Sequence, residues 1–527
     1  MTAKARVIPV QARVSAVIAA LVIVCGLEFL VVHPAADPLP VPLQPLPLVT
    51  VAWVLFVAAA WLLRGVPLRW AVALIIIGAV AIQVVAVSGP PQSSTDLYRY
   101  MWDGRVQAHG YDPYSYVPMA PQLAHIRDPF LFNHHALARF CVGAGVHEPG
   151  YPGLTLAPGC TRINRPTVPT IYPPVAEFYF LALHYVTPVR AGSTPVQAAA
   201  GACAALVTLL LLAGLRWLRR DLRWAALWAW CPTVALEAGN NAHVDVVAVL
   251  LTLAALLVLA LRGSRRRGAL LGGALLGLAI ATKMTPVLVG PAVLKRRWPS
   301  VVGAAAGAVA VVYLPHVLAV GSKVIGFLPG YLQEEGYDSG QRFALISLFA
   351  SGKLAIVIAV LVLAVTGLAV IWFSDPDRPW HAAVVMTGVA LIVTTPKYQW
   401  YAILLVMLVV LDGRPEWLAL AAGGYLGAEP HLGRWREVPH AMVIGYGLAT
   451  LFIALVTMLR WLLARHPEWV WAVRFGWRGA GGAAGLAGAE AGLAGAETEV
   501  ASPETGVAGA ETGVAVTGDA TGSVAAR

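Results

Sequence analysis

Long apolar segments follow one another along most of the chain and are separated by short polar connections. Many approach the ~20 residues that a helix needs to cross a bilayer. Because backbone groups in lipid must be satisfied within their own segment, these stretches predict helices. We expect about 12 to 14 spans. The clearest are Val14–Val32, Leu48–Leu63, Trp70–Val87, Val196–Leu215, Trp224–Leu236, Asp245–Leu261, Ala269–Thr282, Val301–Leu314, Leu354–Phe373, Trp380–Thr394, Trp400–Leu411 and Met442–Leu463, with two shorter candidates at Met284–Leu294 and Trp417–Leu426.

The composition supports a membrane protein. The 527 residues are 58% hydrophobic and only 12% charged, whereas soluble domains carry roughly 25% charged residues. The sequence therefore predicts an all-α integral membrane protein, a polytopic helical bundle whose membrane domain covers residues 1–478.

The net charge of +10 does not indicate nucleic acid, because the basic residues cluster in short connections. These clusters fall on one side if the spans alternate, which is the positive-inside pattern of a multi-pass protein of the cell membrane. Both termini are then cytoplasmic, and residues 89–170 form a large extracytoplasmic loop. The clusters are Lys4, Arg6 and Arg13; Arg64 and Arg69; Arg216, Arg219, Arg220 and Arg223; Arg262, Arg265, Arg266 and Arg267; and Lys295, Arg296 and Arg297.

The two ends of the chain need separate interpretations. A basic start followed by an apolar run is also typical of a signal peptide. The run is too long for a signal core and no small-residue cleavage site follows, so we expect an uncleaved anchor. Residues 479–527 repeat Gly/Ala/Thr units without large apolar side chains, which predicts a disordered cytoplasmic tail.

The outer loop, 89–170, is rich in aromatic residues, prolines and histidines. Long loops in compact proteins tend to be functional. The next segment, Ile171–Tyr185, is either another span or a surface helix that begins at Pro173 and Pro174. Counting it as a span would place the arginines at 216–223 outside, so the charge rule favours the surface helix.

Asp96 opens the helical pattern of the outer loop after the capping-type residues Ser94 and Thr95. Asp103 lies seven residues further on the same face, and Arg99 is within helical reach of both acids. These residues form either a surface ion network or a site in which Asp96 is a general base. Tyr98 and Trp102 offer ring faces to a sugar, and Arg99 and Asp103 join them as substrate-binding candidates.

Polar residues at the outer ends of later spans are further candidates. In EAGNNAHVD, His243 and Asp245 either cap a helix or contact substrate; one His and one Asp are a weak metal signal. Lys283, in ATKMTP, is costly beside apolar sequence, so it either binds a phosphate or extends to water.

Three later segments add polar groups on the same expected face. They are His316, EEGYDSGQR at Glu334–Arg342 and TTPKYQWY at Thr394–Tyr401. Arg342 and Lys397 are able to hold phosphate oxygens. The sequence contains no GxxxxGK[ST], HExxH, GxSxG or CxxC pattern, so nucleotide hydrolysis, zinc proteolysis and serine hydrolysis have no motif support.

The cysteines divide by location. Cys25, Cys203 and Cys231 lie in apolar runs and are expected to be packing residues. Cys141 and Cys160 share the outer loop, where an oxidising compartment permits a disulfide. Two unrelated thiols are the alternative.

The ordered motifs DLYRYMWDGRVQAHGYDPYSYVP, TIYPPVAEFYF, EAGNNAHVD, ATKMTP, EEGYDSGQR and TTPKYQWY resemble those of the GT-C glycosyltransferases. They are most similar to the actinobacterial polyprenyl-phosphate-mannose-dependent mannosyltransferases of glycosyltransferase family 87. The resemblance makes Asp96 the base and places the YPP helix, with Tyr172, on the outer membrane surface. One departure is that the acid follows the third apolar segment here, whereas in the family it usually follows the first. Two additional helices at the start account for this.

The resemblance implies transfer of a sugar, mannose in the first instance, from a polyprenyl phosphate to a glycolipid or polysaccharide with inversion. Lys283, Arg342, His316 and Lys397 would hold the donor phosphate. No cofactor is expected, and metal dependence is left open. The alternative is a lipid or sugar transporter or flippase, which would show repeated halves and polar groups at the membrane midplane. The membrane segments show no internal repeat, and the acids and amides lie at outer helix ends.

Overall fold

The computed structural model describes residues 9–34, 45–132, 161–188, 191–427 and 440–466. Ile8–Leu462 form one compact unit, and the regular elements in its described residues are all helices, with one isolated bridge between Phe132 and Thr161. The all-α polytopic class is confirmed. The expected tail, 479–527, lies outside the described residues.

Eight helical segments in the described residues are long and apolar enough to cross a membrane. Each contains a strongly apolar stretch of 18 residues, as the sequence predicts. In chain order they are α1 (Val10–Val32), α2 (Pro45–Leu63), α3 (Leu68–Ala86), α6 (Thr194–Trp217), α8 (Asp245–Arg262), the segment that begins with α11 (Trp298–Val320), α13 (Gly352–Phe373) and α17 (Ala441–Arg465).

Fewer helices are long spans than the expected number of about 12 to 14, because several apolar runs form short or interrupted helices. Several of the interruptions contain proline, which has no N–H to donate to a helix. The predicted span Trp224–Leu236 breaks at Pro232. The shorter elements are η3 (Leu222–Ala225), α7 (Ala226–Ala229), the π-helix η4 (Val234–Asn240), α9 (Arg266–Ile280), η5 (Thr285–Val289), α10 (Gly290–Val293), α14 (Pro379–Thr394), η8 (Gln399–Ala402), α15 (Ile403–Asp412), η9 (Pro415–Leu418), α16 (Ala419–Gly424) and η10 (Tyr425–Gly427).

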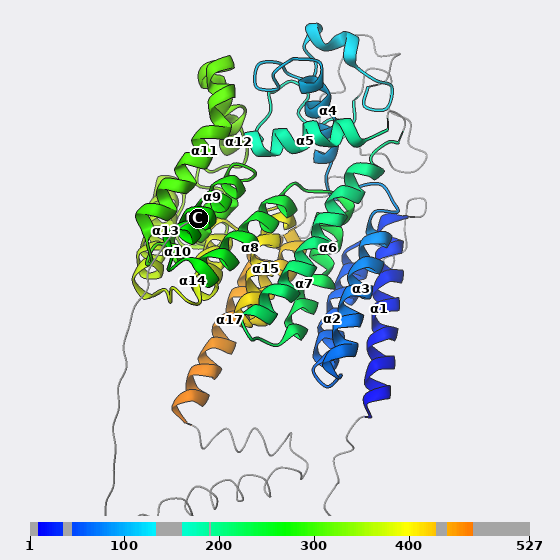
Figure 1. Ribbon diagram of the computed structural model, residues 1–527, viewed down its shortest axis with the longest axis vertical. Coiled ribbons are helices and arrows are strands. Elements are labelled where there is room, and N and C mark those ends of the chain that lie inside the picture. The colour runs from blue at the N-terminus through cyan, green and yellow to red at the C-terminus, as the bar shows by residue number, and fades with distance from the viewer. Residues whose placement is uncertain (1–8, 35–44, 133–160, 189–190, 428–439, 467–527) are drawn as a thin grey trace, which may run out of the picture. The chain divides into compact units, whose positions relative to one another are not determined.

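A smaller group of helices lies beyond one end of the long helices (Figure 1). It contains α4 (Asp96–Ala108), η2 (Pro121–Ile126) and α5 (Pro174–Val186), and α12 (Leu328–Glu334) lies beside it; η6 (Gly321–Ile325) and η7 (Ile346–Leu348) flank α12 in the chain. Pro174 occupies the first turn of α5, as expected for the segment Ile171–Tyr185. α5 runs across the direction of the long helices in Figure 1.

α4 and α5 pack closely because α4 has no side chain at the crossing point. A Cβ atom on Gly104 would lie 2.2 Å from the carbonyl oxygen of Phe180. Beside this crossing the rings of Tyr100 and Phe180 stack with centroids 4.3 Å apart. The first turn of α4, which carries Asp96, is therefore fixed by a glycine-dependent contact half-way along the helix.

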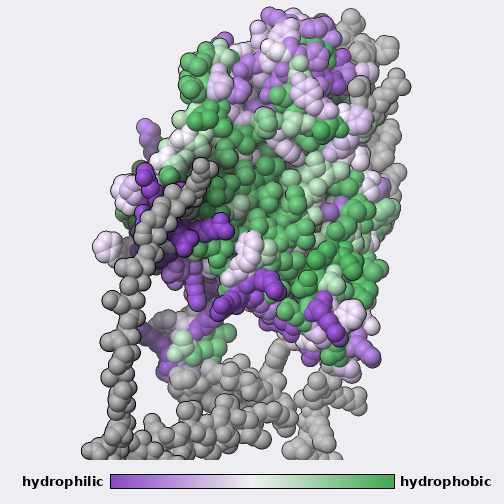
Figure 2. Space-filling model, viewed as in Figure 1, coloured by the Kyte–Doolittle hydropathy of each residue, from purple (hydrophilic) through white to green (hydrophobic). Residues whose placement is uncertain are grey.

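The long helices expose apolar side chains outward. Val311 on α11 is 70% exposed and Trp372 on α13 is 76% exposed. Figure 2 shows the hydrophobic residues as a broad band next to a hydrophilic end. A contiguous apolar surface of this kind is expected where lipid, and not water, surrounds the protein.

Candidate functional site

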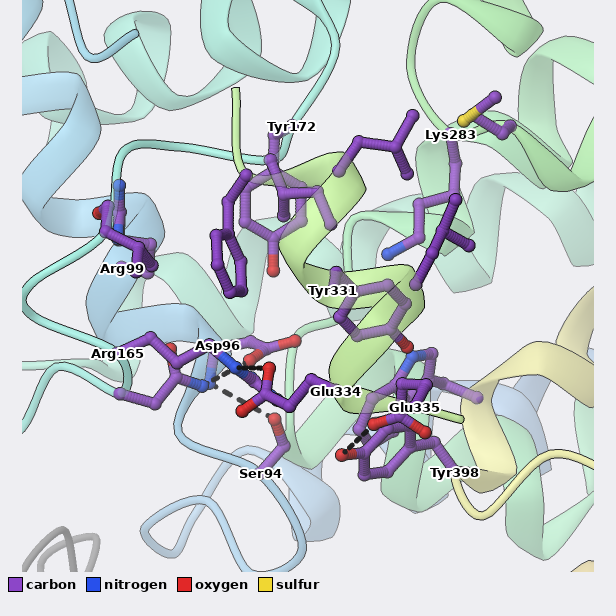
Figure 3. A pocket seen from close by; sticks show the side chains of 18 of the residues that line it. Ser94, Asp96, Arg99, Arg165, Tyr172, Lys283, Tyr331, Glu334, Glu335 and Tyr398 are labelled. Carbon is purple, nitrogen blue, oxygen red and sulfur yellow. Dashed lines mark hydrogen bonds and ion pairs between the residues drawn. The ribbon is translucent and has the colours of Figure 1, made fainter. Parts of the chain in front are cut away.

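A cavity of about 760 Å³ lies between α4, α12 and the turns that follow α9 and α14. Its walls come from five separate segments: the start of α4, the end of the outer loop, the turn after α9, α12 and the turn after α14. Figure 3 shows their side chains facing one another. The polar and aromatic lining residues are Ser94, Thr95, Asp96, Arg99, Asn164, Arg165, Thr167, Tyr172, Lys283, Thr285, Phe327, Tyr331, Glu334, Glu335, Tyr337, Lys397, Tyr398, Trp400 and Tyr401.

Asp96 is the first residue of α4, and hydrogen bonds to its carboxylate and from its backbone hold it at the cavity wall. Asn164 Nδ2 donates to Asp96 Oδ1 at 2.6 Å, and the backbone N–H of Asp96 donates to Ser94 Oγ at 3.1 Å. A carboxylate is also favoured in the first turn of a helix by the exposed N–H groups. The acid is therefore oriented by its neighbours.

Positive charge keeps this carboxyl group ionised. Burial alone would raise the pKa of Asp96, but charge on His243 and Lys283 and the hydrogen bond from Asn164 outweigh it and lower that pKa. The nearest approach of His243 Nδ1 to Asp96 Oδ2 is 3.7 Å. Burial lowers the pKa of His243 to about 3. Near neutral pH the ring is thus neutral, and the charged groups that then act on Asp96 are Lys283 and Arg165.

Lys283 is paired with a carboxylate. Its Nζ lies 3.2 Å from Asp245 Oδ2 and 5.2 Å from the centroid of the Tyr172 ring. Burial opposes its charge, but Asp245, Tyr401 and Asp96 together raise its pKa. The lysine is therefore charged and faces an aromatic wall of the cavity.

Stacked aromatic rings form another wall. The rings of Tyr398 and Trp400 stack with centroids 4.5 Å apart. The His243 ring also stacks on Trp400, with centroids 3.9 Å apart. The hydroxyl groups of Tyr331 and Tyr401 are 2.7 Å apart. Flat aromatic faces with hydroxyl groups at their edges are able to contact both the apolar and polar sides of a sugar ring.

Comparison with known families decides what kind of protein has this cavity. Residues 170–396 match the model of glycosyltransferase family 87. This part of the chain is similar to that family. The match begins after Asp96 and Asn164, and it includes Tyr172, Lys283 and α12. Searches of curated proteins and of solved structures gave no match. Together with the eight apolar segments, the match identifies a membrane glycosyltransferase.

Two cations expected at the phosphate lie outside the cavity lining of this glycosyltransferase. Arg342 is buried, and its Nη1 donates to Glu335 Oε2 at 2.8 Å. His316 Nδ1 lies 3.2 Å from Asp112 Oδ2. Each is held by its own carboxylate behind the wall. Lys283 and Lys397 are the predicted phosphate ligands that the structure brings to the cavity.

Of the predicted substrate residues on α4, one lines the cavity and the others do not. Arg99 lines the cavity and pairs with the buried Asp103 at 2.8 Å. Tyr98 packs edge-on against Phe130, and the buried Trp102 packs against Phe132. The side chains of Tyr98, Trp102 and Asp103 therefore support α4 from behind and do not face the cavity.

The EAGNNAHVD cluster supports the segment that leads into Asp96. The backbone N–H of Gln92 donates to the side-chain oxygens of Asn240 and Asn241, each at 2.9 Å. Asn241 Nδ2 donates to Ser93 Oγ at 2.6 Å. His243 and Asp245 then contact Asp96 and Lys283 from the same segment. The π-helix η4 immediately before it is a feature often found at functional sites.

Two further questions from the sequence concern a metal ion and a disulfide. Among them no three His, Cys, Asp or Glu side chains are grouped in a way that would hold a metal ion. The expected disulfide between Cys141 and Cys160 lies outside the described residues.

Sequence reasoning missed Asn164 and Arg165. They lie at the end of the outer loop in RINRPTVP, which has no helical or strand periodicity. Their position beside Asp96 depends on a contact across 68 residues of chain. An Asn-Arg-Pro turn just before the YPP motif was the available signal, and by itself it is weak.

Proposed function

We propose that this membrane glycosyltransferase transfers a sugar from a polyprenyl phosphate to a glycolipid or polysaccharide on the extracytoplasmic side, with inversion. The motif resemblance favours mannose as the sugar. Asp96 is the general base. The clustering of basic residues in the opposite connections supports this orientation, with both termini in the cytoplasm.

The observation that carries the proposal is an oriented carboxylate, Asp96, in a cavity whose lining also contains the cations Lys283 and Lys397. A sugar that leaves a lipid phosphate needs its new phosphate monoester stabilised by positive charge more than it needs a proton. One carboxylate then suffices, because the acceptor hydroxyl is the group that must lose a proton.

The roles of the individual residues follow from these two requirements. Asp96 accepts the proton of the acceptor hydroxyl as its oxygen attacks the anomeric carbon. Lys283 and Lys397 bind the departing phosphate, and Tyr172, Trp400 and Tyr401 contact the sugar. Base and leaving group lie on opposite faces of the sugar ring in such a displacement, which inverts the anomeric centre.

The test is incubation of membranes that contain the full-length protein with several labelled polyprenyl-phosphate sugars, followed by extraction and analysis of glycolipids and polysaccharide. We expect labelled product from polyprenyl-phosphate mannose with the anomeric configuration inverted. Labelled product from a nucleotide sugar alone, or retention of configuration, would contradict the proposal.

A further inference from the structure

Arg165 reaches the cavity from the end of the outer loop, one residue after Asn164, which holds Asp96. Its backbone φ is 47°, in the left-handed region that residues other than glycine rarely adopt. The Arg165 carbonyl accepts a hydrogen bond from the Val168 N–H at 3.3 Å. A local turn thus fixes the direction in which this guanidinium group is presented.

Arg165 contacts α12 through an exposed ion pair. Its Nε donates to Glu334 Oε2 at 2.8 Å, and its guanidinium carbon lies 5.8 Å from the centroid of the Tyr331 ring. The side chain of Glu334 is 46% exposed. Ion pairs with this exposure contribute little to stability, so another anion is able to replace the Glu334 carboxylate at small cost.

The neighbouring acid, Glu335, has a different environment. It accepts hydrogen bonds from Arg342 at 2.8 Å and from the Tyr398 hydroxyl at 3.0 Å, and it is buried. Removing either partner of a buried ion pair leaves an uncompensated charge. Glu335 is therefore a fixed part of the wall, whereas Glu334, next to it in the chain, is an exchangeable partner.

The pairing of Arg165 also differs from that of two other cations in the cavity lining. Arg99 is held by Asp103 and Lys283 by Asp245, and both of these acids are buried. The counter-ion of Arg165 is exposed and lines the same cavity. Figure 3 shows Arg165 and Glu334 together beside Asp96.

We infer that Arg165 binds a phosphate group of a substrate, and that Glu334 is an internal competitor which pairs with the guanidinium until the phosphate displaces it. A guanidinium group matches two phosphate oxygens at once, whereas the Glu334 contact uses only Nε. The choice of phosphate rests on the proposed function. The phosphate belongs either to the polyprenyl donor or to the acceptor lipid, and the test separates these sources.

The test compares Glu334→Gln, Arg165→Gln and the double variant in the full-length protein. KM for donor and for acceptor is measured separately, together with direct binding of polyprenyl phosphate and of phosphatidylglycerol in detergent. E334Q should tighten phosphate binding about two- to fivefold, the scale expected for an exposed ion pair. R165Q should weaken it about tenfold. The double variant should match R165Q, because the competitor acts only through Arg165.

Two matched controls remove one negative and one positive charge from residues close to Glu334 and Arg165 in the chain. Asp338→Asn changes an exposed acid four residues after Glu334, and Arg162→Gln changes an arginine of the same loop whose Nε donates to the Phe130 carbonyl. Neither residue lines the cavity, and both variants should keep the wild-type constants. A change confined to donor KM and polyprenyl-phosphate binding identifies the donor phosphate; one confined to acceptor KM and phosphatidylglycerol binding identifies the acceptor phosphate.

Weaker phosphate binding by E334Q, wild-type binding by R165Q, or an equal gain from D338N would each overturn the inference. The binding assay keeps this outcome separate from that of the proposed function. If the wild-type protein transferred no sugar but showed the predicted binding pattern, the proposed function would fail and the phosphate site would stand. Transfer without the pattern would leave the function and remove the site.

Discussion

At the scale of single residues, the hydrogen bond from Asn164 to Asp96 predicts a pH effect. The bond stabilises the ionised carboxylate and contributes to its lowered pKa, so Asn164→Ala should raise that pKa. Activity requires the ionised base, and the acid limb of the rate profile should therefore move to higher pH. We expect kcat/KM at neutral pH to fall by about 10- to 100-fold, the scale of one hydrogen bond to a charged group.

The matched variant for this experiment is Asn164→Asp, which places a second negative charge beside Asp96. It should move the acid limb further in the same direction than Asn164→Ala does, because a like charge also disfavours ionisation. The measurement is kcat/KM across pH. An acid limb that stays in place in both variants would show that Asn164 does not act on the base.

A second prediction at this scale concerns Lys283. Lys283→Met leaves the buried Asp245 without its partner, so the protein should lose roughly 3 kcal/mol of stability as well as donor use. The double variant Lys283→Met/Asp245→Asn should recover most of the stability and none of the donor use. Thermal unfolding and donor KM separate the two effects. Recovery of both would assign Lys283 a purely structural role.

Individual residues show which parts of the site could be predicted from the sequence. Lys283 stands out because it is an ionisable group beside apolar sequence, where an idle charge is costly, and Asp96 because it opens a helical pattern after capping-type residues. Arg342 was chosen because a guanidinium group is able to hold phosphate oxygens, yet it is buried against Glu335. Sequence identifies a charge but does not show whether its partner is a substrate or a carboxylate from a turn nearby.

At the scale of elements, Gly104 predicts the sensitivity of the α4–α5 contact. Gly104→Ala would place a Cβ atom against the Phe180 carbonyl and should cost about 1–3 kcal/mol. Activity should fall as well, since α4 carries Asp96. Gly307→Ala on α11 is the matched control, with no atom within 4 Å of the new Cβ, and should stabilise the helix by about 0.4–1 kcal/mol. Equal melting temperatures for the two variants would contradict this packing.

Helices were easier to predict than their interruptions. The bounds of α1, α3, α8 and α13 lie close to the apolar runs in the sequence, because a long run without proline has one stable form in lipid. The run Trp224–Leu236 was predicted as one span, but it forms η3, α7 and the π-helix η4. Asn240 and Asn241 at the end of η4 accept hydrogen bonds from the distant Gln92, and a periodic pattern does not predict such contacts.

At the scale of the whole molecule, sequence predicted a polar site at one end of an apolar bundle, and the cavity lies there. It placed Asp96 and Lys283 in one site, but it did not predict that Tyr331 and Trp400 share the same cavity. That meeting depends on how the ends of separate helices pack, which no local pattern specifies. The family match from 170–396 covers Tyr172, Lys283 and Tyr331. Asp96 lies before the match, and the lining residues Lys397, Tyr398, Trp400 and Tyr401 lie after it.

The most direct test of the central claim is transfer by Asp96→Asn. This variant keeps the size of the side chain and removes the base, so we expect a folded protein whose rate from labelled polyprenyl-phosphate mannose is lower by ~10²–10⁴-fold. The assay uses equal amounts of wild-type and variant protein in membranes, with unchanged thermal unfolding as the check on folding. A folded D96N protein that retained more than about a tenth of the wild-type rate would contradict the assignment of Asp96 as the general base.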